Sequence, residues 1–147
     1  MKKQQVPDTA RADIIESAGN QPGVREAEAT GFIHLRPETI RKIKDNKLKQ
    51  GDVIALAEMA GVEAVKNISS VVPQVQHVSL TKAEVKAYAY PNGIEIKSFM
   101  RSVSKTGLET EALTAVCVAL LTLFEICKPL DNSLALGDIK LTRKTQE

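Results

Sequence analysis

The stretch TKAEVKAYAYPNGIEIKSFMRSV, Thr81–Val103, decides the fold. It contains two runs in which apolar and polar residues alternate, joined by Pro91-Asn92-Gly93. Alternation with a period of two is typical of half-buried strands. An Asn-Gly pair between two such runs is the strongest local signal for a β-hairpin. The sequence therefore predicts two adjacent antiparallel strands near the middle of the chain.

The chain before this hairpin predicts one strand and two helices. VREAEATGFIHL, residues 24–35, alternates enough to form a strand. Pro37 then occupies a favourable first-turn position for a short helix, PETIRKIKDN. The next stretch, GDVIALAEMAGVEAVKNIS, predicts a second helix because apolar residues recur with a helical period at Ile54, Ala57, Gly61, Val65 and Ile68. Pro73 interrupts this pattern and begins a connector.

The chain after the hairpin predicts a long helix over Leu108–Lys128 and a final strand around LALGDIKLTRKT. The order β-α-α-β-β-α-β predicts an α+β, ferredoxin-like fold, in which an antiparallel sheet carries its helices on one face. Residues 1–21 are polar and run into the turn-rich GNQPG, so we expect an irregular N-terminal segment. Residues 22–147 are expected to form a single domain.

The composition excludes several classes of function. Of the 147 residues, 43% are hydrophobic and 26% charged, as in ordinary globular proteins. The net charge of +2 and an aromatic content of 3% argue against nucleic-acid binding by bulk charge or base stacking. The N-terminus lacks the apolar run of a secretory signal. The thirteen uncharged residues between Glu111 and Glu125 are fewer than the about 20 that a membrane span needs. We therefore expect a cytoplasmic protein without membrane or nucleic-acid partners.

The two cysteines are expected to be reduced thiols. Cys117 and Cys127 fall on the same predicted helix, which would place them about 15 Å apart, too far for a disulfide. The sequence has only two histidines and no Cys/His cluster, so no metal site is predicted.

The long helix carries charged residues at both ends. Glu111 and Glu125 lie on nearly the same side but about 21 Å apart along the axis, and Lys128 is one turn beyond Glu125. The two ends cannot contact one small ligand within a single subunit, so a site that uses both must lie between subunits. The alternative is that the acids and the lysine only complement the helix dipole. Arg101 and Lys105 precede the helix and suit phosphate binding at its N-terminus.

KTGLETEALTA and VALLTLFEICK resemble the signature helix of the MoaC family, the cyclic pyranopterin monophosphate synthases of molybdenum cofactor biosynthesis. VREAEATGFIHLRPETI and GDVIALAEMAGVEAVK agree in the same order, so the resemblance covers about Val24–Lys128. It implies a lyase that converts cyclised GTP (3′,8-cyclo-7,8-dihydro-GTP) into cyclic pyranopterin monophosphate with release of pyrophosphate. It also implies a homo-hexamer, a trimer of dimers, with sites between subunits.

The resemblance assigns roles to individual residues. Lys128 would transfer protons and Glu125 would orient it. The matching catalytic positions are Lys128, Glu125, Glu111 and Glu109. The matching substrate-binding positions are Lys66, Lys105, Arg101, Asp52, Gln50, Gln76 and His77, of which the lysines and Arg101 would hold phosphates. The resemblance requires no metal or other cofactor of the protein and leaves open whether Mg²⁺ accompanies the phosphates.

The chain departs from the family pattern at three positions. Gln50 and Gln76 stand where the family has a lysine and a histidine, and Glu125 stands where aspartate is usual. Glutamine can form hydrogen bonds but does not titrate, and loss of a general acid or base costs about 10²–10⁴-fold in rate. His77 is one residue late, and adjacent side chains in an extended segment point to opposite faces; its alternative is a surface loop histidine. A non-catalytic relative that binds a nucleotide or pterin, or serves as an oligomeric partner, thus remains an alternative, as does a related enzyme with an altered substrate.

Overall fold

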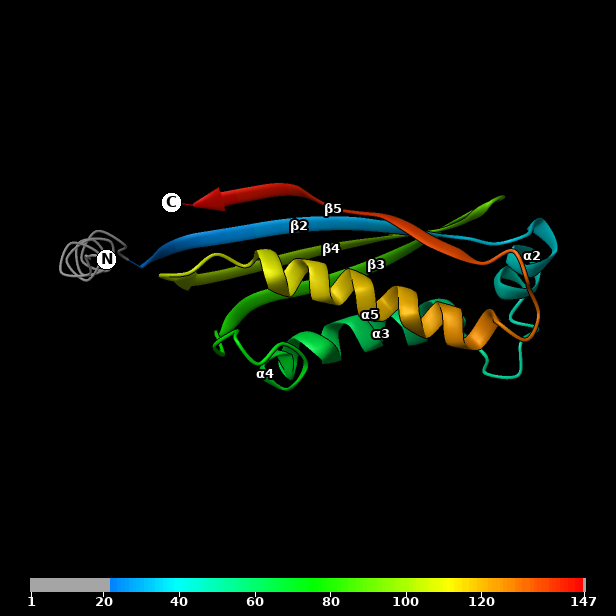
Figure 1. The fold of residues 1–147 in the computed structure, drawn as a ribbon, viewed down its shortest axis with the longest axis horizontal. Helices are drawn as coiled ribbons and strands as arrows, with labels where there is room; N and C mark the ends of the chain where they lie inside the picture. The colour runs from blue at the N-terminus through cyan, green and yellow to red at the C-terminus, as the bar shows by residue number, and fades with distance from the viewer. Residues whose placement is uncertain (1–21, 147) are drawn as a thin grey trace, which may run out of the picture.

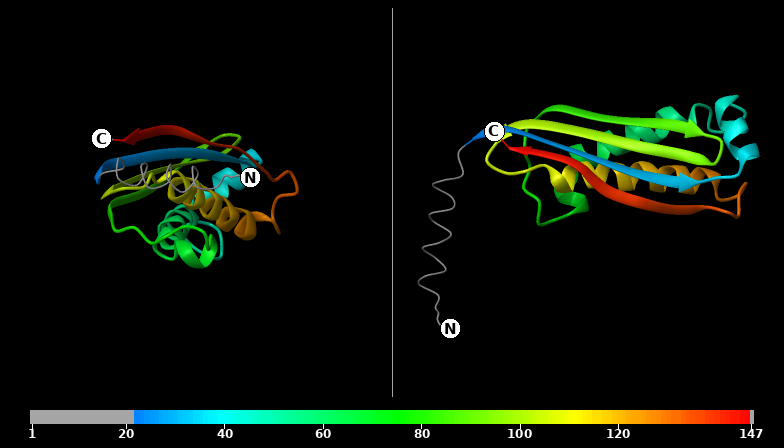
Figure 2. Two further views of the ribbon diagram at one scale, coloured as in Figure 1. Left: turned by 60° about the vertical axis from the view of Figure 1, so that its left-hand side comes forward. Right: turned by 90° about the horizontal axis from the view of Figure 1, so that it is seen from above.

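The computed structural model describes residues 22–146, in which a four-stranded sheet carries its helices on one face (Figures 1 and 2). The strand order is β3-β4-β2-β5, and all three neighbouring pairs are antiparallel. The strands are β2 (Gly23–His34), β3 (Leu80–Tyr90), β4 (Gly93–Ser104) and β5 (Ala135–Gln146). The helices are α2 (Pro37–Lys44), α3 (Val53–Lys66), α4 (Ile68–Val71) and α5 (Glu109–Cys127). This arrangement confirms the predicted ferredoxin-like α+β fold.

The predicted hairpin joins β3 to β4 in the structure. Tyr90 pairs with Gly93 across the turn, and the two strands continue in register from Lys82 opposite Arg101. Gly93 is required here because a β-carbon would collide with the carbonyl oxygen of Ile33 on the neighbouring strand β2. The Asn-Gly pair therefore serves both the turn and the close packing of β4 on β2.

The core between the sheet and α5 is aliphatic, as the scarcity of aromatic residues requires. Ala27, Ala29 and Ile33 project from alternate positions of β2 and are fully buried. They meet the face of α5 that contains Ala112, Ala115, Val116, Ala119, Leu120 and Leu123, all fully buried. Small residues on both sides allow the helix to pack closely on the sheet.

Helices α3 and α5 lie side by side and run in opposite directions beneath the sheet (Figure 1). Gly61 of α3 sits at their contact, where a β-carbon would lie 2.8 Å from the carbonyl oxygen of Ala115. As a result, the loop leading into α3 lies at the same end of the molecule as the C-terminus of α5 (Figure 1). The C-terminus of α3 lies at the other end, with the N-terminus of α5.

The structure differs from the sequence-based expectations in two details. The predicted second helix ends at Lys66, and Ile68 belongs to the separate four-residue helix α4. Helix α5 spans 19 residues and is by length and composition alone apolar enough to cross a membrane, although the uncharged stretch within it is shorter. Half of its most apolar window is buried inside the molecule, so α5 is the core helix of this fold. The irregular segment predicted for residues 1–21 lies outside the described residues.

Candidate functional site

The residues predicted for the site collect at the two ends of the α3–α5 pair. At one end are those around the start of α5 and the end of α3, namely Glu109, Glu111, Arg101, Lys105, Lys66, Gln76 and His77. At the other end are those around the end of α5 and the start of α3, namely Glu125, Lys128, Gln50 and Asp52. On helix α5, Glu111 of the first group and Glu125 of the second lie fourteen residues apart, a distance of about 21 Å along the axis. One subunit therefore does not bring the two groups together.

Glu109 opens α5 in a basic environment. Its carboxylate forms an ion pair with Lys144 of β5, with Oε2 2.7 Å from Nζ. The hydrogen bond from Lys144 lowers the pKa of Glu109, and the charge of Arg25 acts in the same direction. Arg25 itself is buried, and its guanidinium donates hydrogen bonds to the carbonyl oxygens of Ser104 and Lys105. This arginine fixes the loop that leads into α5.

Glu111 lies two residues further along and has the opposite electrostatic character. It is buried, and that burial raises the pKa of its carboxyl group. Glu111 lines a hollow of about 440 Å³ together with Gln74 and Gln76 of the connector and Thr110 of the helix. The structure thus places Gln76 and the Glu111 carboxyl group in the lining of the same hollow.

His77 lines a different hollow. That hollow, of about 350 Å³, is formed by the C-terminus of α3 and the start of β3 and includes Lys66 and Lys82. The two neighbours Gln76 and His77 therefore line separate hollows, one with Glu111 and one with Lys66. This arrangement agrees with the opposite directions of adjacent side chains in an extended segment.

Arg101 and Lys105 differ in how strongly the fold engages them. The Arg101 guanidinium pairs with Glu26, with Nε 2.7 Å from Oε2. Glu26 is buried and also pairs with Arg143, at 3.2 Å. The Lys105 side chain is exposed on the loop before α5, so it is placed more freely for an incoming anion than Arg101 is.

At the other end, Lys128 follows the last residue of α5 and pairs with Glu125, with Nζ 3.0 Å from Oε1. The ion pair expected from their spacing is therefore present, and both side chains are at least half exposed. Asp52 is the N-cap of α3 and accepts a hydrogen bond from the Ala55 amide at 3.0 Å. Gln50 is exposed in the loop just before it.

Sequence reasoning missed three residues at these ends. Arg25 and Lys144 flank Glu109, and Asp131 is buried just beyond Lys128. Arg25 carried a usable signal, because the alternation of β2 assigns it to the same face as Ala27, and a charge on a buried face calls for partners. The partners of the other two depend on chain segments far apart in the sequence.

The described residues contain no group of three or more His, Cys, Asp or Glu side chains arranged to hold a metal ion. Cys117 and Cys127 are free thiols in the described part of the chain. Burial raises the pKa of Cys127 to about 11, assisted by the negative charge of Asp131, so this thiol is a core residue and not a nucleophile.

The fold and the position of these residues define a ferredoxin-like α+β protein with clusters of acids and bases at both ends of one core helix. The family model described as "MoaC family" matches residues 14–146. The chain is 35% identical over 142 residues to the cyclic pyranopterin monophosphate synthase of Thermoanaerobacter sp. (strain X514), covering 95% of this chain and 90% of that protein. It is 37% identical over 136 residues to the synthase of the same name from Desulfitobacterium hafniense (strain DSM 10664 / DCB-2), covering 92% and 83%. The chain belongs to the MoaC family.

Proposed function

We propose that this protein is a cyclic pyranopterin monophosphate synthase of molybdenum cofactor biosynthesis. It is a cytoplasmic lyase that converts 3′,8-cyclo-7,8-dihydro-GTP into cyclic pyranopterin monophosphate and releases pyrophosphate. Membership of the family and the names of the relatives support the reaction. The observation that carries the proposal is the presence of two opposed acid–base clusters on α5, Glu109 with Glu111 and Glu125 with Lys128.

The Lys128 ammonium group is the proton donor and acceptor of this proposal. Its ion pair with Glu125 holds the amine close to a carboxylate, an arrangement that suits a group that first gives a proton to the opening ring. Glu111 complements it, because burial raises the pKa of its carboxyl group, and the carboxylate therefore accepts a proton more readily than an exposed one does. Glu109, held ionised by Lys144, is suited to orient the substrate.

The triphosphate requires cations at the same end as Glu111. Lys66 and Lys105 supply exposed ammonium groups there, while Arg101 has to share its guanidinium between Glu26 and a phosphate. Pyrophosphate leaves when a hydroxyl of the substrate attacks the α-phosphorus, which forms the cyclic ester and breaks the bond to the β-phosphate; these cations would hold the two departing phosphates. Phosphate recognition thus falls to the Glu111 end of the subunit, and proton transfer by Lys128 falls to the opposite end.

This separation supports a homo-oligomer in which each site takes one end from each of two subunits. We propose the trimer of dimers, in which the Glu111 end of one subunit meets the Lys128 end of its partner. A symmetric pair of this kind contains two equivalent sites, each assembled from both chains.

Complementation tests the shared site directly. Glu111→Gln and Lys128→Ala are each expected to abolish turnover, and random mixing of the two inactive chains should restore about a quarter of the wild-type activity per subunit, because half of the pairs are mixed and each contains one intact site. The control mixes each variant with itself through the same unfolding and refolding. A mixture as inactive as its components would refute the shared site.

The reaction itself is tested by supplying 3′,8-cyclo-7,8-dihydro-GTP and following pyrophosphate and pterin release. Gln50 and Gln76 favour a second candidate, a relative that binds the nucleotide or pterin without converting it. Binding without turnover would support that second candidate, and turnover that depends on Lys128 would exclude it.

A further inference from the structure

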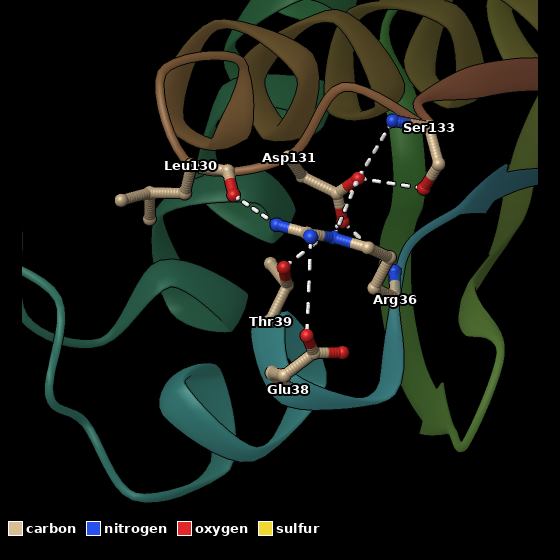
Figure 3. Close-up of polar contacts among 6 residues, drawn as sticks. All are labelled: Arg36, Glu38, Thr39, Leu130, Asp131 and Ser133. Carbon is tan, nitrogen blue, oxygen red and sulfur yellow. Dashed lines mark hydrogen bonds and ion pairs between the residues drawn. The ribbon is translucent and has the colours of Figure 1, made fainter.

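Asp131 is buried at the turn that follows Lys128 (Figure 3). Its Oδ2 accepts hydrogen bonds from the backbone amide of Arg36 at 2.8 Å and from the Thr39 hydroxyl at 2.9 Å. Its Oδ1 accepts them from the amide and the hydroxyl of Ser133 at 2.8 and 2.6 Å. The carboxylate thus joins two segments that lie more than 90 residues apart in the sequence, the β2–α2 junction and the turn beyond α5.

The Arg36 side chain holds the same turn from its other side. Nη2 donates a hydrogen bond to the carbonyl oxygen of Leu130 at 2.6 Å, and Nε lies 3.5 Å from Asp131 Oδ1. The amide of Leu130 donates in turn to the carbonyl of Cys127 at 2.9 Å. Lys128 therefore lies at the start of a short turn that is closed by the hydrogen bond between Leu130 and Cys127. The amide and the guanidinium of Arg36, together with Asp131, connect this turn to the β2–α2 junction.

The Asp131 carboxylate is satisfied by hydrogen-bond donors within this cluster. Burial alone would raise the pKa of the carboxyl group, but the hydrogen bonds from Ser133, Arg36 and Thr39 hold that pKa well below its usual range. A helix can end on solvent or on a simple capping residue, so its termination does not require a buried carboxylate with four donors. A buried ionic cluster is weak evidence for a gain in stability, so a defined local geometry is the role to test here.

The Asp131 cluster defines the backbone geometry at Lys128, the residue at the end of α5. Among the described residues, the Lys128 amine has one ion-pair partner, Glu125, which is itself largely exposed. The side chains alone therefore cannot fix the direction of the amine. We propose that Asp131 is a positioning residue for Lys128: it fixes the backbone turn that carries the lysine, so that the amine is presented to the partner subunit in one orientation. This inference rests on the proposed function for its catalytic consequence.

Asp131→Asn is the sharpest variant, because it keeps the shape of the side chain. An amide offers one acceptor and one donor group, whereas both backbone amides, of Arg36 and Ser133, must donate to residue 131. In either orientation of the amide, one backbone N–H loses its acceptor. Thr39→Ser keeps the hydroxyl donor and should behave as the wild type, while Thr39→Val removes one donor and should give an intermediate effect.

Ile43→Val is the matched control for loss of stability, because Ile43 is a buried apolar residue of α2. At a temperature where all variants are folded, Asp131→Asn should lower kcat about 10- to 100-fold, as a small misplacement of a catalytic group does, with KM within about twofold of the wild type. Ile43→Val should lower the melting temperature without changing kcat. Equal kcat for Asp131→Asn and the wild type would overturn the positioning role.

A second measurement needs no turnover. Acetylation of the full-length protein by an N-hydroxysuccinimide ester, quantified at Lys128 by peptide mass spectrometry with the exposed Lys86 as reference, reports how well the amine is held in its ion pair. Asp131→Asn should raise the rate at Lys128 roughly two- to fivefold and leave Lys86 unchanged. If the wild type fails to convert the cyclised GTP, the proposed function fails, while a raised rate still supports the positioning role. An unchanged rate overturns it.

Discussion

Substitution of Gly61 by alanine tests whether the α3–α5 contact sets both ends of the site. In a helix interior this change gains about 1 kcal/mol of helix propensity. Here the new β-carbon would lie 2.8 Å from the carbonyl oxygen of Ala115 and 3.2 Å from both γ-carbons of Val85. Real β-carbons do not approach a backbone oxygen so closely, and Ala115 cannot move without the whole of α5. Overpacking of this type costs about 1–3 kcal/mol.

The competing terms leave Gly61→Ala less stable than the wild type by up to about 2 kcal/mol. Urea unfolding followed by far-ultraviolet circular dichroism at fixed protein concentration measures this difference. Gly137→Ala is the control, because a β-carbon at Gly137 has nothing within 4 Å, and its stability should change by less than about 1 kcal/mol. Gly61→Ala should also lower the activity, since α3 and α5 together hold residues of both clusters. A Gly61→Ala protein more stable than the wild type would refute the reasoning.

Three further outcomes are expected. The folded-state pKa of Asp131 lies below its unfolded value, so its ionised form stabilises the protein above about pH 4. This contribution is lost as the pH falls further. Asp131→Asn should therefore show a weaker loss of stability than the wild type between pH 5 and pH 3 in urea unfolding. Lys144→Gln should raise the pKa of Glu109, visible in a carboxyl-carbon NMR titration. Gln50→Lys combined with Gln76→His should raise turnover of the cyclised GTP, and unchanged turnover would show that the chemistry does not depend on titrating groups at these positions.

The sequence predicted the elements whose signals are local. Asn92-Gly93 between alternating runs marked the hairpin, and Pro37 marked the start of α2. Helical periodicity also predicted the Glu125–Lys128 ion pair, because residues three apart share one helix face. Periodicity failed at Asn67, where the apolar pattern continues into Ile68 although the helix ends, since a pattern of side chains does not report a change in backbone angle.

The remaining features of the site depend on contacts between distant segments. The sequence carried no signal for Asp131, because only the fold brings Arg36 and Thr39 to its carboxylate. Arg101 read as a free phosphate ligand, but β2 places the buried Glu26 directly beside it. The pairing register decides such partnerships, and a single sequence does not state that register for strands far apart in the chain.

The two glutamines are best understood together. Gln50 lies in the loop before α3, at the Lys128 end, whereas Gln76 lines the hollow with Glu111 at the opposite end. In a monomeric site their effects would be independent, because groups so far apart with no shared partner have additive effects. In a site shared between subunits, Gln50 of one chain and Gln76 of the other meet at the same substrate. Gln50→Lys and Gln76→His should then be non-additive, with the double variant gaining more activity than the product of the two single gains. Additive gains would instead separate the two ends functionally and argue against the shared site.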